Sequence, residues 1–559
     1  MNFDRIIRNA KVYNTYMQSF INADVAIKDG KFVRIAEHLA CDDVEIIDAK
    51  GCYMIPGLVD IHMHIESSMS IPSQFSDAVL PHGTTSVVAD PHEIANVFGL
   101  EGILSFLSTE TELDIFYGIP SSVPSTNPNL ETTGGTIGVE EVKELLVDNR
   151  IICLGEVMNF HDVCYEPSSL SAKIIKTCRE IRPQMPLEGH CPKVSGQKLA
   201  DFLSQGIWGD HTHQSAQSVV EKITNGMFLE IQRKSMTSDV MQTLMNHQFY
   251  EYFCFVTDDV MADHLRYGHL NRLVEKAIQM GMPPEKAIYC ATFTPARHMH
   301  LHDRGVIAPG RIADFIFLDD LSSFHIKEVY KCGKKVEKKR NDDKIKFPKH
   351  FYHSLQCRKA IKEDFLIPAQ GKRALCNIMS IEPHSTFTTH KKEWFPIHDG
   401  YVDKSDCALL TIFERYGKHG GISHGFVENA INGKGAIATS WAHDHHNVMV
   451  LGTDVEDMLL AQHTLLEMQG GFVVVKNHQI IAQAALEIGG IVSAKSIEEL
   501  GEDIAAVRKG MQELGYLHDN EIMSMSTLSL LVSPQLKMSD RGMIDTETQE
   551  IVPLVEEIE

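Results

Sequence analysis

The chain of 559 residues lacks the features of several classes of protein. It has no apolar run near the roughly 18 residues that cross a bilayer. Its first residues form no apolar signal-peptide core. Basic side chains number 52 against 75 acidic ones, and the formal net charge of −23 repels phosphate backbones and anionic membranes. We therefore expect a cytoplasmic protein with neither nucleic acid nor membrane as a partner.

Paired cysteines are also missing. The 12 cysteines include no Cys-x-x-Cys pair, which indicates reduced thiols in a cytosol rather than a disulfide framework or a structural zinc knuckle. Hydrophobic residues make up 43% and charged residues 23% of the chain, as in an ordinary globular protein. Because this length exceeds what one hydrophobic core accommodates, we expect two or three domains.

The order of apolar patterns predicts three domains. Strand-like runs alternate with helical patterns over residues 56–302, and repeated βα units over roughly 250 residues predict an α/β fold, a TIM-like (β/α)8 barrel. Strand-like runs before and after this region predict a small composite β-sandwich from residues 1–55 and 303–335. Residues 347–559 mix strand and helix patterns and predict a C-terminal mixed α/β domain.

A His-x-His pair stands at the end of the first expected barrel strand. His62 and His64 follow the buried, strand-like run 54–61. Residues i and i+2 of a strand face the same side, so both imidazoles can grip one metal ion. Taken alone, such a pair is more often a coincidence of the surface or the core.

The other expected strand ends complete a ligand set. Active sites of parallel barrels lie at the carboxyl ends of the strands. Four histidines and two carboxylates follow separate expected strands: His62, His64, Glu156, His190, His211 and Asp258. Separately, Glu156 could be a helix N-terminal charge, Asp258 an N-cap and His190 a hydrogen-bonded core histidine. Together they suffice for two divalent ions that share a bridging carboxylate.

The motifs around these residues resemble a known family. The segment 57–64, Gly-Leu-Val-Asp-Ile-His-Met-His, resembles the strand-one signature of the amidohydrolase superfamily. Further segments resemble the adenine deaminases of bacteria within it: 65–69, 81–85, 89–97, 155–159, 257–259, 268–269, 303–310, 442–444, 452–454 and 536–542. The resemblance covers nearly the whole chain, including the C-terminal domain that most amidohydrolases lack.

The resemblance implies an enzyme that removes ammonia from C6 of adenine by hydrolysis and gives hypoxanthine, a step of purine salvage. It implies two divalent ions, with manganese favoured and Fe(II) or zinc as alternatives. Asp258 would act as general base and then acid, and Glu156 would bridge or anchor the ions. The expected partners are a purine base and further copies of the chain, in a homodimer or higher homo-oligomer.

Two groups of polar residues are candidates for substrate binding. Asp90, His92 and Glu93 follow the second expected barrel strand, where they could line the pocket, hold a ligand histidine or form a helix N-terminal cluster. Asp259 could orient substrate or cap a helix.

The polar segment 440–447 is either a solvated loop or a flap over the barrel mouth. We predict the flap, with His443 and Asp444 within hydrogen-bonding range of substrate or of a metal-bound water. The spacing of His445 and His446 does not indicate a third metal site.

Two departures from the family pattern bear on the substrate. Thr212 stands where the family usually has a glutamate, and Lys234 lies where an Arg-Glu-Gly-Ser segment is usual. They motivate an alternative, the hydrolysis of another amino-heterocycle or of a cyclic amide by the same binuclear centre. A non-catalytic descendant of the fold would be expected to lack metal ligands, and none of the six is missing.

Overall fold

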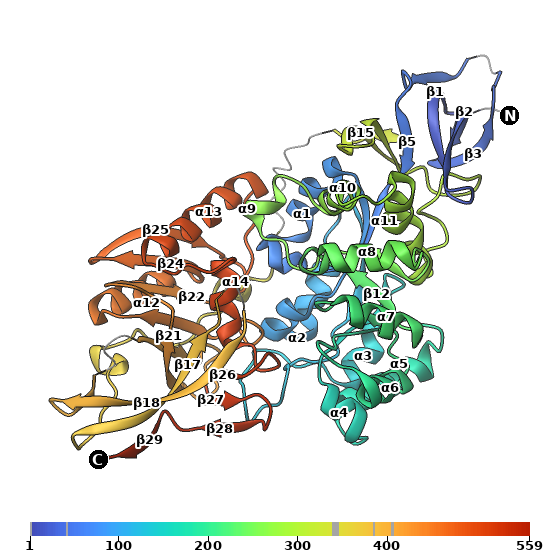
Figure 1. Cartoon of the computed structure of the whole chain (residues 1–559). Coiled ribbons are helices and arrows are strands. Elements are labelled where there is room, and N and C mark those ends of the chain that lie inside the picture. The colour runs from blue at the N-terminus through green and yellow to red at the C-terminus, as the bar shows by residue number, and fades with distance from the viewer. Residues whose placement is uncertain (1–2, 41–42, 338–345, 384–385, 404–406) are drawn as a thin grey trace.

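A computed structural model of the chain describes residues 3–40, 43–337, 346–383, 386–403 and 407–559. Eight parallel strands follow one another in the first half of the chain (Figure 1). They are β6 (Leu58–Met63), β7 (Thr84–Ala89), β8 (Asp114–Ile119), β9 (Ile151–Val157), β10 (Leu187–Gly189), β11 (Gly209–Asp210), β12 (Phe228–Ile231) and β13 (Phe253–Phe255). Neighbours are paired in two parallel runs, β6 to β10 and β11 to β13.

The two runs form one curled sheet. Strand β10 contacts β11, and a parallel bridge joins Met63, at the end of β6, to Asp258, just after β13. Every residue of β6 and β7 is buried, as expected for parallel strands that are covered on both faces. Because all eight strands run the same way, their carboxyl ends meet at one end of the sheet.

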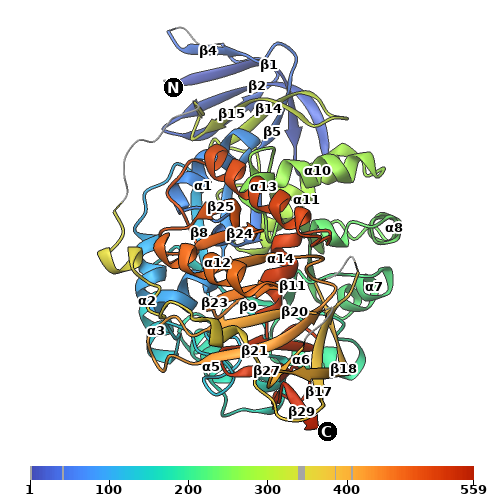
Figure 2. The same ribbon diagram turned by 90° about the vertical axis from the view of Figure 1, so that its left-hand side faces the viewer.

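Helices connect these strands and surround them (Figures 1 and 2). They are α1 (Pro72–Val79), α2 (His92–Leu107), α3 (Val139–Leu145), α4 (Phe160–Tyr165), α5 (Leu170–Ile181), α6 (Gly196–Ser204), α7 (Ala216–Thr224), α8 (Ser238–Asn246), α9 (Ala262–Leu265), α10 (Leu270–Gln279) and α11 (Pro284–His298). In α5, Ser169 caps the first turn by accepting a hydrogen bond from the Ala172 N–H. Among the described residues, no helix has the length and apolar character that crossing a membrane requires.

The first strands pair with strands that follow the curled sheet in sequence. These strands are β1 (Arg5–Asn14), β2 (Ser19–Lys28), β3 (Lys31–Ala36), β4 (Glu45–Asp48), β5 (Tyr53–Pro56), β14 (Phe315–Asp320), β15 (His325–Lys331) and β16 (Lys334–Lys335). They form one sheet in the order β16-β15-β14-β5-β1-β2-β3, with β4 beside β1. The sequence predicted a sandwich of two sheets here. The structure has a single sheet, because β5 is hydrogen-bonded to both β1 and β14.

The last two hundred residues contain a second large sheet. Its strands are β17 (Arg373–Ile381), β18 (Thr388–His398), β19 (Tyr401–Val402), β20 (Ala408–Phe413), β21 (Ile422–Glu428), β22 (Ala436–Thr439), β23 (Val448–Gly452), β24 (Gly471–Lys476), β25 (Gln479–Ala485) and β29 (Val555–Ile558). Helices α12 (Val455–Glu467) and α13 (Ile497–Glu513) pack against β24. Helix α14 (Glu521–Ser526) and a small sheet of β26 (Leu536–Ser539), β27 (Gly542–Asp545) and β28 (Glu550–Val552) complete this part.

The C-terminal part packs directly against the curled sheet and its helices. One hydrophobic cluster contains Met63 and Ile94 from the first half together with Trp441 and Ile504 from the second. Helix α13 contacts α9, where the Arg508 guanidinium lies 2.9 Å from the carboxylate of Asp263. This packing brings the loop between β22 and β23 to the carboxyl ends of the parallel strands.

Candidate metal centre at the strand ends

The structure brings together all six residues predicted as metal ligands. His62 lies in β6 and His64 follows it, Glu156 lies in β9, and His190, His211 and Asp258 follow β10, β11 and β13. Five of the six are buried, and His190 is partly exposed. Three of the groups of side chains that could hold a metal ion are drawn from these residues: His62, His64 and Glu156; Glu156, His190 and His211; and His64 and Asp258 with Asp259.

The carboxylate of Glu156 faces two different sets of imidazoles. Its Oε1 lies 3.5 Å from His64 Nε2. Its Oε2 lies 2.6 Å from His190 Nδ1 and 3.2 Å from His211 Nε2. On the first side, Asp258 Oδ1 is 3.6 Å from His64 Nε2 and 3.7 Å from His62 Nε2. One carboxylate between two ligand sets is the arrangement that a pair of ions bridged by Glu156 requires.

The charge states of these groups suit metal ligands. Burial alone would raise the pKa of Glu156, but the charges of His211 and His190 outweigh it and hold this pKa well below the usual range. Burial likewise opposes ionisation of Asp258, yet its hydrogen bond with His64 and the charge of His211 lower its pKa. Burial, followed by the charge of His211, holds the pKa of His62 well below its usual value, so this imidazole is neutral.

Other groups in the centre carry protons that a cation would displace. Burial lowers the pKa of His211, but the charge of Glu156 and their hydrogen bond raise it overall to about 9. Metal ligands must be deprotonated, so a cation bound here would release this proton. Among the described residues, no group hydrogen-bonds to the buried His62 Nε2, which leaves that nitrogen for an ion. Imidazole and carboxylate donors without thiolate suit manganese, Fe(II) and zinc.

Asp90 lies beneath the centre rather than at the mouth. Its backbone carbonyl lies 3.0 Å from His64 Nδ1, which directs His64 Nε2 towards Glu156. Its carboxylate accepts a hydrogen bond of 2.8 Å from the Glu156 N–H. This approach needs Gly155, because a Cβ there would lie 2.1 Å from Asp90 Oδ2.

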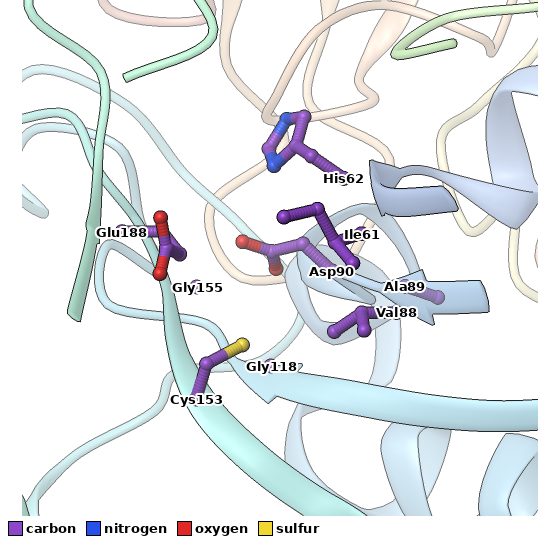
Figure 3. A pocket seen from close by; sticks show the side chains of 9 residues that line it. All are labelled: Ile61, His62, Val88, Ala89, Asp90, Gly118, Cys153, Gly155 and Glu188. Carbon is purple, nitrogen blue, oxygen red and sulfur yellow. The ribbon is translucent and has the colours of Figure 1, made fainter. Parts of the chain in front are cut away.

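Figure 3 shows Asp90 among the residues that line a small pocket inside the curled sheet, together with His62, Cys153 and Glu188. The pocket has a volume of about 10 Å³, about the size of one water molecule. It is too small for a purine base, so a substrate must bind on the other side of the ligands.

Two buried carboxylates near the centre escaped the sequence argument. Glu230 lies in β12 with its Oε2 3.9 Å from His62 Nδ1, and no described residue donates a hydrogen bond to either of its oxygens. Burial, followed by the charges of Glu188 and Asp210, raises its pKa well above the usual value, so Glu230 is protonated. An acidic residue at a fully buried strand position was the available signal.

The two departures from the family pattern do not face the ligands. The Thr212 hydroxyl donates to both oxygens of Asp210, at 2.9 and 3.0 Å. Asp210 in turn forms a buried ion pair of 2.6 Å with Lys222. Lys234 lies in the short 3-10 helix Arg233–Ser235, and its side chain is exposed.

The segment 440–447 is buried throughout, which contradicts the solvated-loop interpretation. His443 and His446 both contact the carboxylate of Glu93, at the start of α2. Asp444 Oδ1 lies 4.0 Å from His92 Nε2. His92 Nδ1 is itself 3.8 Å from Glu156 Oε1. The C-terminal part of the same chain therefore reaches the edge of the centre. The role of His446 was missed by sequence reasoning.

Comparisons with known proteins agree with this geometry. Residues 53–336 match the amidohydrolase family, and residues 385–550 match the adenine deaminase C-terminal domain. An adenine deaminase 2 of Oenococcus oeni is 49% identical over 99% of this chain and 98% of its own length. An adenine deaminase of Clostridium perfringens is 49% identical over 99% of both chains. One of Lactobacillus delbrueckii is 48% identical over 99% of both.

The fold and the ligand set are therefore those of an amidohydrolase, a class of hydrolases that acts on carbon–nitrogen bonds among others. Within that class, the chain belongs to the adenine deaminase family.

Proposed function

We propose that this chain hydrolyses adenine to hypoxanthine and ammonia, at two divalent ions held at the carboxyl ends of a closed (β/α)8 barrel. The full-length similarity to proteins named adenine deaminases supports the reaction. The observation that carries the two-ion centre is the position of Glu156, which offers one oxygen to His64 and the other to His190 and His211. Such a reaction belongs to purine salvage.

The ligands divide into two sets that share Glu156. His62, His64 and Asp258 form the first set, and His190 and His211 form the second. Divalent ions bound there would lower the pKa of a water molecule, so that hydroxide is available near neutral pH. The donors fit manganese, Fe(II) and zinc, and we propose manganese. A homodimer or higher assembly remains a prediction.

The side chains supply the proton transfers. Asp258 is ionised and has an oxygen on the substrate side of His62 and His64, so it can take a proton from the attacking water. It then passes this proton to the leaving amino nitrogen. Removing one proton and returning it at the adjacent group requires one carboxylate within reach of both positions.

Substrate recognition falls to residues around the mouth. Asp259 is partly buried and accepts a hydrogen bond of 2.5 Å from the Ser67 hydroxyl. His443 Nε2 and Asp444 Oδ2 are buried, and no described residue hydrogen-bonds to them. A planar base has several hydrogen-bonding edge atoms, and unsatisfied buried groups are suited to pair with them. Asp90, His92 and Glu93 would act behind these residues, by holding ligands and the C-terminal loop in place.

The alternative substrates have lost their motive. Another amino-heterocycle or a cyclic amide was suggested by Thr212 and Lys234. The Thr212 hydroxyl is occupied by Asp210, and Lys234 is exposed to solvent, so neither side chain is available to a base above the ligands.

A substrate screen tests the proposal. Purified, manganese-loaded protein is offered adenine, other aminopurines and cyclic amides, with ammonia release as the readout and hypoxanthine identified as product. We expect adenine to be the best substrate. A cyclic amide hydrolysed faster than adenine, with no ammonia released from adenine, would contradict the proposal.

A further inference from the structure

A second cluster of metal-ligand side chains lies beside the proposed two-ion centre and shares no residue with it. His92 and Glu93 begin α2, and His443 and Asp444 lie in the loop between β22 and β23. The four side chains are among the groups that could hold a metal ion. Each is at most 6% exposed. Two imidazoles and two carboxylates are therefore enclosed at the contact between the two halves of the chain.

One atom from each residue points to a common position. His92 Nε2 lies 3.6 Å from Glu93 Oε1 and 4.0 Å from Asp444 Oδ1. His443 Nδ1 lies 3.5 Å from Asp444 Oδ1 and contacts Glu93 Oε1. The ligand atoms of the four residues are all within 4.8 Å of one another. Atoms at the corners of a tetrahedron, each roughly 2.0–2.2 Å from an ion, lie roughly 3.3–3.6 Å apart, so these spacings suit one cation.

A neighbouring histidine orients the cluster as an outer-shell group would. His446 Nε2 hydrogen-bonds to Glu93 Oε2, which leaves Glu93 Oε1 directed at the other three side chains. Although Glu93 is 1% exposed, no described residue donates a hydrogen bond to that Oε1. A ligand carboxylate held by a second hydrogen bond on its other oxygen is a common feature of metal sites.

The cluster also has a charge requirement. Burial opposes ionisation of Glu93, yet the charges of His443, His446 and His92 hold its pKa well below the usual range. A second carboxylate, that of Asp444, lies in the same enclosure. Two buried carboxylates require positive charge, which can come from protons on His92 and His443 or from a divalent ion.

We propose that His92, Glu93, His443 and Asp444 bind one further divalent cation, separate from the two-ion centre. The cation fastens the C-terminal loop to the start of α2, and so fixes the wall of the cavity in which substrate binds. His443 Nε2 and Asp444 Oδ2 remain free to face that cavity. Nitrogen and carboxylate donors in equal number suit zinc, manganese and Fe(II). The proposal does not depend on adenine being the substrate.

Metal counting tests this proposal. The full-length protein is stripped of metal, incubated with excess Mn²⁺ or Zn²⁺, and weighed by native mass spectrometry, with elemental analysis alongside. We expect three ions per wild-type chain and two per chain in His443→Ala and in Asp444→Asn. His445→Gln is the matched control, because His445 is buried in the same loop but lies outside the cluster, and it should retain three.

The same count separates this site from the two-ion centre. His190→Ala removes a ligand of the centre, so it should lose an ion there while the ion that depends on His443 is retained. Two ions in both the wild type and His443→Ala would overturn the proposal, and so would three ions in both.

A direct image guards against variants that fail to fold. Anomalous diffraction from crystals of the metal-loaded wild type should show a third peak between His92 and His443. Density for the four side chains without such a peak would mean that protonated histidines supply the charge, and the proposal would be wrong.

Discussion

Replacing Asp258 by asparagine removes the proposed proton carrier and little else. The amide matches the carboxylate in volume, so the packing around it is retained. It cannot take a proton near neutral pH, and it lacks the negative charge that Asp258 presents to His64 and His62 at 3.6 and 3.7 Å. Because the residue is only 7% exposed, bulk water has little access to take over the transfer.

The expected loss follows from the usual size of general acid–base catalysis. Turnover should fall by at least about 10²-fold and by up to about 10⁴-fold. At about 1.36 kcal/mol for each factor of ten, the barrier rises by about 2.7 to 5.4 kcal/mol. The assay is ammonia release at saturating adenine, with bound metal measured on the same samples. Asp258→Asn should remain slow at full metal loading.

Asp259→Asn is the matched control. Its neighbouring carboxylate accepts a hydrogen bond from Ser67, which the amide oxygen of asparagine also accepts. We expect a raised KM and less than about a tenfold change in kcat, since a binding contact common to ground and transition states mainly alters KM. Equal and small effects of the two substitutions would refute the role given to Asp258.

Three further predictions concern the support of the site. Lys222→Met should lower the free energy of unfolding by about 3–5 kcal/mol, because it leaves the buried Asp210 carboxylate unpaired. The charge of Lys222 lowers the pKa of Asp210 against the effect of burial, so this pair stabilises the wild type above about pH 4 and the stabilisation is lost as the pH falls; urea unfolding at several pH values measures both effects. Thr212→Glu should destabilise the fold without improving adenine turnover, since it places a second carboxylate beside Asp210, and a faster and equally stable variant would contradict this account. Gly155→Ala should weaken metal binding, measured by chelator competition, because the added Cβ collides with Asp90; an unchanged metal affinity would argue against a supporting role for Asp90.

The ligand set could be predicted because it depends on a rule of topology. Parallel strands bring their carboxyl ends together, so residues that follow separate strands converge even when they are far apart in sequence. His62, Glu156 and Asp258 were found in this way, without knowledge of the helices between them. Strand β11 is only two residues long, yet the polar residues after it still marked its end.

The polar contacts between the two halves of the chain could not be predicted. Glu93 and His446 are 353 positions apart, and no periodic pattern links them. The segment 440–447 is polar enough to be read as a solvated loop, because composition does not reveal whether polar groups pair inside the protein. Thr212 was misread for a related reason: its neighbour in sequence is a metal ligand, but its hydroxyl points to Asp210 instead of the substrate side.

The most direct test of the central claim is a titration of metal-free protein with Mn²⁺, in which ammonia release from adenine and bound metal are measured together. The account predicts no measurable turnover without metal and activity that requires occupancy of both positions of the Glu156-bridged centre. His190→Ala, which lacks a ligand of that centre, should stay inactive throughout the titration. Full activity in protein shown to be free of metal would contradict the account, and so would a fully loaded wild type that releases no ammonia from adenine.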